Sequence, residues 1–191
     1  MNAIPQAAPE ISKQKQELLP YLIQSRVRVL AVLAEVPEEL SGIRLTENSW
    51  SILECAEHIA AAERGMFTLL ERRTPNSAAP DFARDALIKA LGTDRSRKVS
   101  APERARPTGR FASLKQAIDD FCGARARTIA FLERTDEDLR KSIAVHPLGT
   151  FDAFQFLLIM AAHAERHALQ IEEIKNSAAY REARSRRESH S

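Results

Sequence analysis

The sequence contains 191 residues, and its 28 lysines and arginines exceed its 26 aspartates and glutamates by only two charges. This length fits one domain, and so small a net charge gives no reason to expect a nucleic-acid partner. Hydrophobic residues make up 44% of the chain, which is enough for a core. A membrane-spanning helix needs about 18 consecutive apolar residues, and no run in the sequence is that long. The first ten residues do not resemble a secretion signal. We therefore expect a cytoplasmic protein that makes no membrane contact.

The first part of the chain predicts two long helices. Residues 1–9 are expected to form a flexible arm. A helix follows over residues 10–35, with apolar side chains every three or four positions: Leu19, Ile23, Val27, Leu30 and Ala34. Pro20 falls early in this pattern and could instead mark the first helical turn. A second helix is expected over residues 49–73, with Ser49 as its N-cap.

The segment over residues 74–110 is long and irregular, and only residues 81–91 within it have a helical pattern. Connections of this length in a small domain are usually functional covers or disordered linkers. The segment is also the most basic internal part of the chain, with Arg95, Arg97, Lys98, Arg104, Arg106 and Arg110. These cations are consistent with a solvated loop, or with a lid that supplies positive charge to an anionic substrate.

Two further helices are expected over residues 112–134 and 150–177, with a short helical turn over residues 136–141 between them. The tail over residues 178–191 is polar and is expected to be disordered or weakly helical. Strand-length runs of alternating polarity are missing from the sequence. Four amphipathic helices therefore predict an all-α four-helix bundle over residues 10–177, with a long crossover between the second and third helices.

Arg125 is unusual because it stands in the apolar stripe of the helix over residues 112–134. Its long side chain could extend to the edge of the bundle. It could instead pair with a buried carboxylate such as Glu54, or contact a substrate.

Three histidines interrupt helix faces that are otherwise apolar. His163 and His167 stand four residues apart in the last helix, so they share one face and are about 6 Å apart along the axis. His58 lies in the apolar stripe of the second helix. A buried ring needs a partner, and neutral imidazole is a favoured ligand for zinc, nickel, copper and iron. The three rings therefore predict one metal site with an open position. Two histidines at this spacing also arise by chance, and they lack the adjacent glutamate of zinc proteases.

Groups that would orient these rings can also be sought in the sequence, because ligating histidines usually donate their other N–H to a carboxylate or carbonyl. Glu54 is the preferred candidate, since it lies one turn before His58 on the same helix face. Glu57 and Glu165 point about 100° away from the histidines next to them. Gln170 follows the last of the three histidines by three residues, so it can bond to that ring or close the site.

One pattern spans much of the chain: Trp50-Ser51-x-x-Glu54-x-x-x-His58 and, after a long gap, His163-x-x-x-His167-x-x-Gln170. It resembles the DinB/YfiT-like superfamily over about residues 11–175, and His146-Pro147 and Gly149 before the last helix are also similar to that family. The resemblance implies an up-down-down-up bundle, often a homodimer. It also implies a divalent metal, most often nickel or zinc, held by the three matching histidines. His146 and Arg125 join Glu54 and Gln170 as candidates for groups around this metal.

The resemblance leaves three functions open. Some relatives are transferases or isomerases that use bacillithiol, mycothiol or glutathione. The first hypothesis is therefore a metal-dependent transferase that adds a low-molecular-weight thiol to a small-molecule substrate, for which Cys55 is dispensable. The second is a metal-dependent hydrolase, which needs a general base such as Glu54. The third is a non-catalytic, stress-related protein whose metal is structural.

Overall fold

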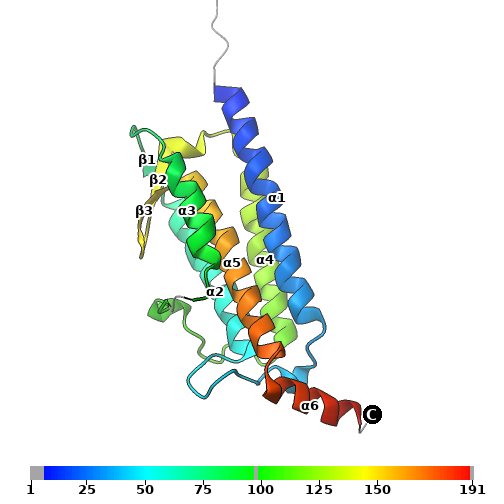
Figure 1. Cartoon of the computed structure of the whole chain (residues 1–191). Helices are drawn as coiled ribbons and strands as arrows, with labels where there is room; N and C mark the ends of the chain where they lie inside the picture. The colour runs from blue at the N-terminus through cyan, green and yellow to red at the C-terminus, as the bar shows by residue number, and fades with distance from the viewer. Residues whose placement is uncertain (1–6, 97–98, 190–191) are drawn as a thin grey trace, which may run out of the picture.

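Four long helices form the body of the computed structural model, which describes residues 7–96 and 99–189. They are α1 (Ala7–Ala34), α2 (Ile52–Glu71), α4 (Leu114–Arg134) and α5 (Ala153–Lys175). Figure 1 shows that α1 and α5 run in one direction, and that α2 and α4 run in the opposite direction. This is the up-down-down-up order, and the connection from α2 to α4 is the long crossover. None of the helices in the described residues is both long and apolar enough to cross a membrane.

The most enclosed helix is α5, which packs against α1, α2 and α3 (Phe82–Thr93). The predicted short helix of the crossover is α3, and it runs along α5 on the outside of the bundle (Figure 1). Small side chains allow the neighbours of α5 to approach closely, and its buried residues include Ala161, Ala162, Ala164 and Ala168. The crossover therefore covers a face of α5 that a plain four-helix bundle would leave in water.

A small antiparallel sheet interrupts the helices. β1 (Thr74–Pro75) pairs with β2 (Ser142–His146), and β2 pairs with β3 (Gly149–Asp152), so that His146 lies opposite Gly149. The strict all-α prediction is therefore corrected. The strands are too short to give a clear alternating pattern, and an isolated hairpin is marginally stable in water. Burial of Ala144 and Phe151 against the bundle stabilises this one.

Local capping decides where α2 and α5 begin. The N-cap of α2 is Ser51, two residues later than predicted, because its hydroxyl accepts the N–H of Glu54. The Glu54 carboxylate in turn accepts the N–H of Ser51 at 2.7 Å, which completes a capping box. α5 begins at Ala153, later than predicted, because the residues before it pair in β3 and Asp152 caps the helix.

The first helix begins earlier than predicted, and the tail takes the helical one of its two expected forms. α1 begins at Ala7 and continues through Pro20, so the expected arm over residues 1–9 already contains the first turn of a helix. Residues 1–6 of that arm lie outside the described residues. The tail, expected to be disordered or weakly helical, forms α6 (Ala178–Glu188), and residues 190–191 are not described. One apolar ring explains this helix, because Tyr180 is only 1% exposed and packs into the core.

A buried ion pair joins all four long helices. Arg125 of α4 is fully buried and makes two 2.8 Å hydrogen bonds to Glu63 of α2. It also donates to a carbonyl and a hydroxyl of α1, and to the Met160 carbonyl of α5 at 3.0 Å. Arg125 thus does not extend to the bundle edge. It pairs with a buried carboxylate, as the sequence suggested, but the partner is Glu63 and not Glu54.

Gly92 allows the close contact between α3 and α5, because a Cβ at this position would lie 2.5 Å from the Cβ of Ala162. We predict that Gly92→Ala lowers the free energy of unfolding by about 1–3 kcal/mol through overpacking. The matched control is Gly65→Ala in α2, where an added Cβ meets nothing within 4 Å. That variant should stabilise the protein by about 0.5–1 kcal/mol. Urea denaturation measures both, and the same sign for the two variants would contradict this account.

Candidate metal centre

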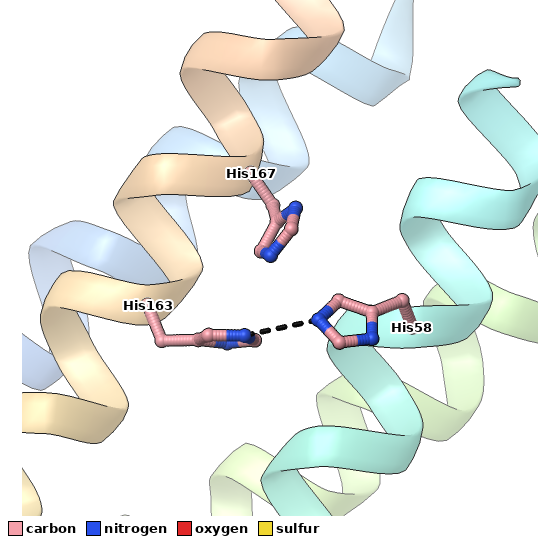
Figure 2. Close-up of side chains that lie close together, drawn as sticks. All are labelled: His58, His163 and His167. Carbon is pink, nitrogen blue, oxygen red and sulfur yellow. Dashed lines mark hydrogen bonds between the residues drawn. The ribbon is translucent and has the colours of Figure 1, made fainter. Parts of the chain in front are cut away.

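Three imidazole rings from two helices converge on one point (Figure 2). His58 comes from α2, and His163 and His167 come from successive turns of α5. The Nε2 atoms of His58 and His163 are 3.0 Å apart, and one ring nitrogen from each of the three residues lies within 4.8 Å of the others. His58 and His167 are buried whereas His163 is half-buried, so the cluster meets solvent on the His163 side.

Hydrogen bonds at the outer nitrogens orient two of the rings. The Nδ1 atom of His58 lies 2.6 Å from the carbonyl oxygen of Ala105. A carbonyl only accepts, so Nδ1 carries the proton and Nε2 presents its lone pair to the cluster. The Nδ1 atom of His167 lies 2.9 Å from Oε1 of Gln170, which assigns the same tautomer. The bond that the position of Gln170 predicted is therefore present.

The donor set fits a divalent cation. The unprotonated Nε2 atoms of His58 and His167 face the same small volume, and neither can donate a hydrogen bond to the other. Each Zn–N bond is about 2.0–2.1 Å, so two nitrogens on one ion are at most about 4.2 Å apart. The 4.8 Å bound on the three nitrogens slightly exceeds this value, so binding of an ion would require only a small closure of the three rings. Three neutral imidazoles with an open position are the ligands of a catalytic type of site.

Trp50 forms one wall of the cluster. Its ring centroid lies 4.6 Å from that of His58 and 6.0 Å from that of His167. It directly precedes the N-cap of α2, so the capping box also fixes the chain that carries this ring. An apolar wall of this kind controls the access of water to the imidazoles.

Burial keeps the three histidines neutral. Loss of solvent is the largest cause that lowers the pKa of each ring, and it takes His163 and His167 well below the usual 6.5. Positive charge acts in the same direction, from Arg110 on His58 and from Arg95 on His167. Neutral imidazole is the form that binds a metal, so the cluster is in its binding form at neutral pH.

The structure corrects the roles expected for Glu54 and Arg125. The Glu54 carboxylate is used in the capping box and in a 3.2 Å ion pair with Arg44. The partner of His58 is instead a backbone carbonyl, Ala105, from the crossover segment. A carbonyl carries no side-chain signature, so the sequence could not have shown it. Arg125 serves the buried ion pair with α2, although its charge contributes to the lowered pKa of the half-buried histidine.

His146 lies at the end of β2, beside the ligand-bearing face of α5. Its ring packs edge-on against Phe156, with the centroids 5.7 Å apart, and Phe156 precedes His163 by two turns of the helix. The Nδ1 atom accepts the N–H of Leu148 at 3.1 Å, which leaves the ring proton on Nε2. Burial lowers the pKa of His146, and the charge of Arg104 lowers it further. His146 therefore lies near the cluster together with the cation of Arg104, and its Nε2–H can act as a hydrogen-bond donor.

The lowered pKa values predict a pH-dependent stability for the metal-free protein. Below the usual pKa of 6.5 the unfolded chain binds a proton that the buried His167 ring does not. The stabilising contribution is thus present above pH 6.5 and is lost as the pH falls below it. We expect His167→Gln to reduce the slope of the unfolding free energy between pH 6.5 and 5 by up to about 1.4 kcal/mol per pH unit. Urea titrations of chelator-treated protein measure this slope, and parallel curves for the two proteins would refute the assignment.

Comparisons with known proteins agree with this architecture. A family model described as the DinB superfamily matches residues 21–171, which include all three histidines. Among solved structures, the chain is similar in fold to YfiT from Bacillus subtilis, described as a probable metal-dependent hydrolase with an unusual four-helix bundle topology. The two chains are 14% identical, the match covers 92% of this chain and 90% of that one, and the TM-score is 0.55. No curated protein matches the chain. The resemblance seen in the sequence is thus confirmed, and the chain belongs to the DinB superfamily.

Proposed function

We propose that His58, His163 and His167 hold a divalent metal ion, nickel or zinc, and that the protein uses it to transfer a low-molecular-weight thiol to a small electrophilic substrate. The convergence of three neutral ring nitrogens is the observation that carries the metal site. When bound, such an ion acts as a Lewis acid that lowers the pKa of a thiol or water and polarises an acceptor group. The resemblance to relatives that use thiols supports the reaction class.

Each residue around the triad has a role in this proposal. The Ala105 carbonyl and the Gln170 side chain hold the outer N–H groups of two rings, which keeps the metal-binding nitrogens directed inward. Trp50 excludes water from one side of the rings. The half-buried ring of His163 marks the side from which a substrate arrives.

The carboxylates next to the triad are all engaged in other contacts, so none of them stands ready as the general base of a hydrolase. Hydrolysis usually employs a base within hydrogen-bond reach of the attacking water. Glu54 is used in its capping box, Glu57 binds backbone N–H groups, and Glu165 accepts from Tyr21. A thiol made acidic by the metal needs no such base. Nor does it need Cys55, whose pKa is raised to about 12 by burial.

Positive charge beside the triad suits an anionic thiol. Arg104 is exposed and lies close enough to His146 for its charge to lower the pKa of that ring. Among the residues that the structure describes, it forms no ion pair with a carboxylate. It directly precedes Ala105, the partner of His58, so its guanidinium belongs to the segment that lies against the metal site. We expect Arg104, with the Nε2–H of His146, to contact a carboxylate of the thiol cosubstrate.

A metal-dependent hydrolase is the second candidate. The specific observation in its favour is the similar fold of YfiT, which is described as a probable metal-dependent hydrolase. In this case the metal site is the same, and the base would have to come from the substrate or from a group other than Glu54. The homodimer and the cytoplasmic location expected from the sequence stay predictions.

A metal held by the triad should stabilise the folded protein, because it binds the native state and not the unfolded one. At a free metal concentration about one hundred times the Kd, this stabilisation is about 2.7 kcal/mol. We predict that a chelator lowers the melting temperature and that His163→Ala removes most of this effect. The control is His146→Ala, which should keep the chelator effect. An unchanged effect in His163→Ala would show that the ion binds elsewhere.

The reaction class can be tested with a panel of thiols and acceptors. We expect turnover of a chlorinated aromatic or an epoxide with bacillithiol or glutathione, abolished in the alanine variant of each triad histidine and retained in Cys55→Ser.

Arg104→Gln should raise the KM for these anionic thiols by up to about fivefold, the scale of an exposed ion pair. It should leave mycothiol, which has no carboxylate, unchanged. Turnover of esters without a thiol would support the hydrolase, and inactivity on both panels with metal bound would support a non-catalytic role.

A further inference from the structure

The crossover segment is attached to α2 through a buried carboxylate that the proposed reaction does not use. Glu57 is only 1% exposed. Its Oε1 accepts the N–H of Thr108 at 2.7 Å, and its Oε2 accepts the N–H of Gly109 at 3.1 Å. Arg110 adds an ion pair of 2.9 Å. Gly109 has a φ of +74°, which a side chain would disfavour, and this turn directs two successive N–H groups at one carboxylate.

The same stretch of chain reaches the metal site at the very next residue of α2. Ala105 is buried, and its carbonyl is 2.6 Å from Nδ1 of His58. Residues 102–110, which we call the strap, are thus bound to α2 at both Glu57 and His58. Ala105 and Thr108 are three residues apart, so even a fully extended chain places them at most about 10 Å from each other. The position of the Ala105 carbonyl is therefore constrained by the Glu57 bonds.

We propose that Glu57 is a positioning residue for the metal site: it fixes the strap, and the strap holds the Nδ1–H tautomer and the ring orientation of His58. This inference rests on the proposed metal site for its effect on affinity. Charge-assisted hydrogen bonds from two N–H groups to one carboxylate are stronger and more directional than neutral ones. The coupling is reciprocal, so that a metal on the triad also stabilises the docked strap. Arg104 lies within the strap, so Glu57 sets the position of that cation as well.

The test compares variants that change the strap with one that does not. Glu57→Gln keeps the shape of the side chain but places an amide N–H against a backbone N–H. Gly109→Ala leaves the carboxylate intact and strains the turn that presents the second N–H, with nothing within 4 Å of the added Cβ. Glu38→Gln is the matched control, because Glu38 also accepts a backbone N–H, from Leu114 at 2.7 Å, and has no bond to the strap.

Two measurements separate positioning from a loss of stability. In metal-free protein, ¹H–¹⁵N correlation spectra of the imidazoles report the tautomer of His58 and the exchange rate of its Nδ1–H with water. We expect this exchange to be about tenfold faster in Glu57→Gln and in Gly109→Ala, and unchanged in Glu38→Gln. Zinc titration against a competing chelator should give about tenfold weaker binding in the first two variants, at the lower end of the effect of outer-shell partners.

The outcomes distinguish this inference from the proposed function. Wild-type exchange and zinc affinity in both strap variants would overturn the role of Glu57 while leaving the metal site in place. A wild-type protein that binds neither zinc nor nickel would overturn the proposed function, yet the exchange rate would still test the link from Glu57 to His58. A loss of zinc affinity equal to that in Glu38→Gln would show a general loosening of the fold, and would also refute the positioning role.

Discussion

The structure depends on one buried interaction, the ion pair between Arg125 and Glu63. Its hydrogen bonds reach α1, α2 and α5 from α4, so a single guanidinium fixes the relative positions of all four long helices. Removing one partner of such a pair typically costs about 3–5 kcal/mol, because the other charge is left buried and unpaired. Glu63 follows His58 by five residues, and Met160 precedes His163 by three. The pair therefore sets the spacing of α2 and α5 next to the histidines.

This spacing explains how the fold keeps three imidazoles together. His163 can hydrogen-bond to Nε2 of His58 at 3.0 Å, but the unprotonated nitrogens of His58 and His167 gain nothing from each other, and burial without partners would destabilise the protein. The outer nitrogens recover part of this cost through the Ala105 carbonyl and Gln170. The remaining lone pairs are suited to a cation. The unpaired lone pairs of the triad thus destabilise the fold locally, and the rest of the bundle holds the rings in place. A bound ion would remove this cost.

The long crossover is more than a connection between parallel helices. Its first part forms α3, which covers α5, and a later part docks on α2 beside the metal site. Between these parts, Arg95 makes a bidentate pair with Glu173 of α5. Both ligand-bearing helices are thus held by one segment. The up-down-down-up order requires a connection that returns along the whole bundle, and this chain uses it to surround the site.

The sequence by itself determined the helical periods and the pairing of His167 with Gln170, because these depend on spacing within one helix. It also showed His58 as a polar residue in an apolar helix stripe, and the motif around the three histidines showed the family. His163 and His167 must share a face at a separation of four residues, whatever the rest of the chain does. The tertiary structure alone decided the partners that are distant in sequence. Arg125 pairs with Glu63 and not with Glu54, because the Glu54 carboxylate caps the N-terminus of α2. The partner of His58 is a backbone carbonyl 47 residues away, and β2 and β3 form only where the bundle buries one side of them. Such contacts depend on how helices are placed in space, which no local pattern of residues specifies.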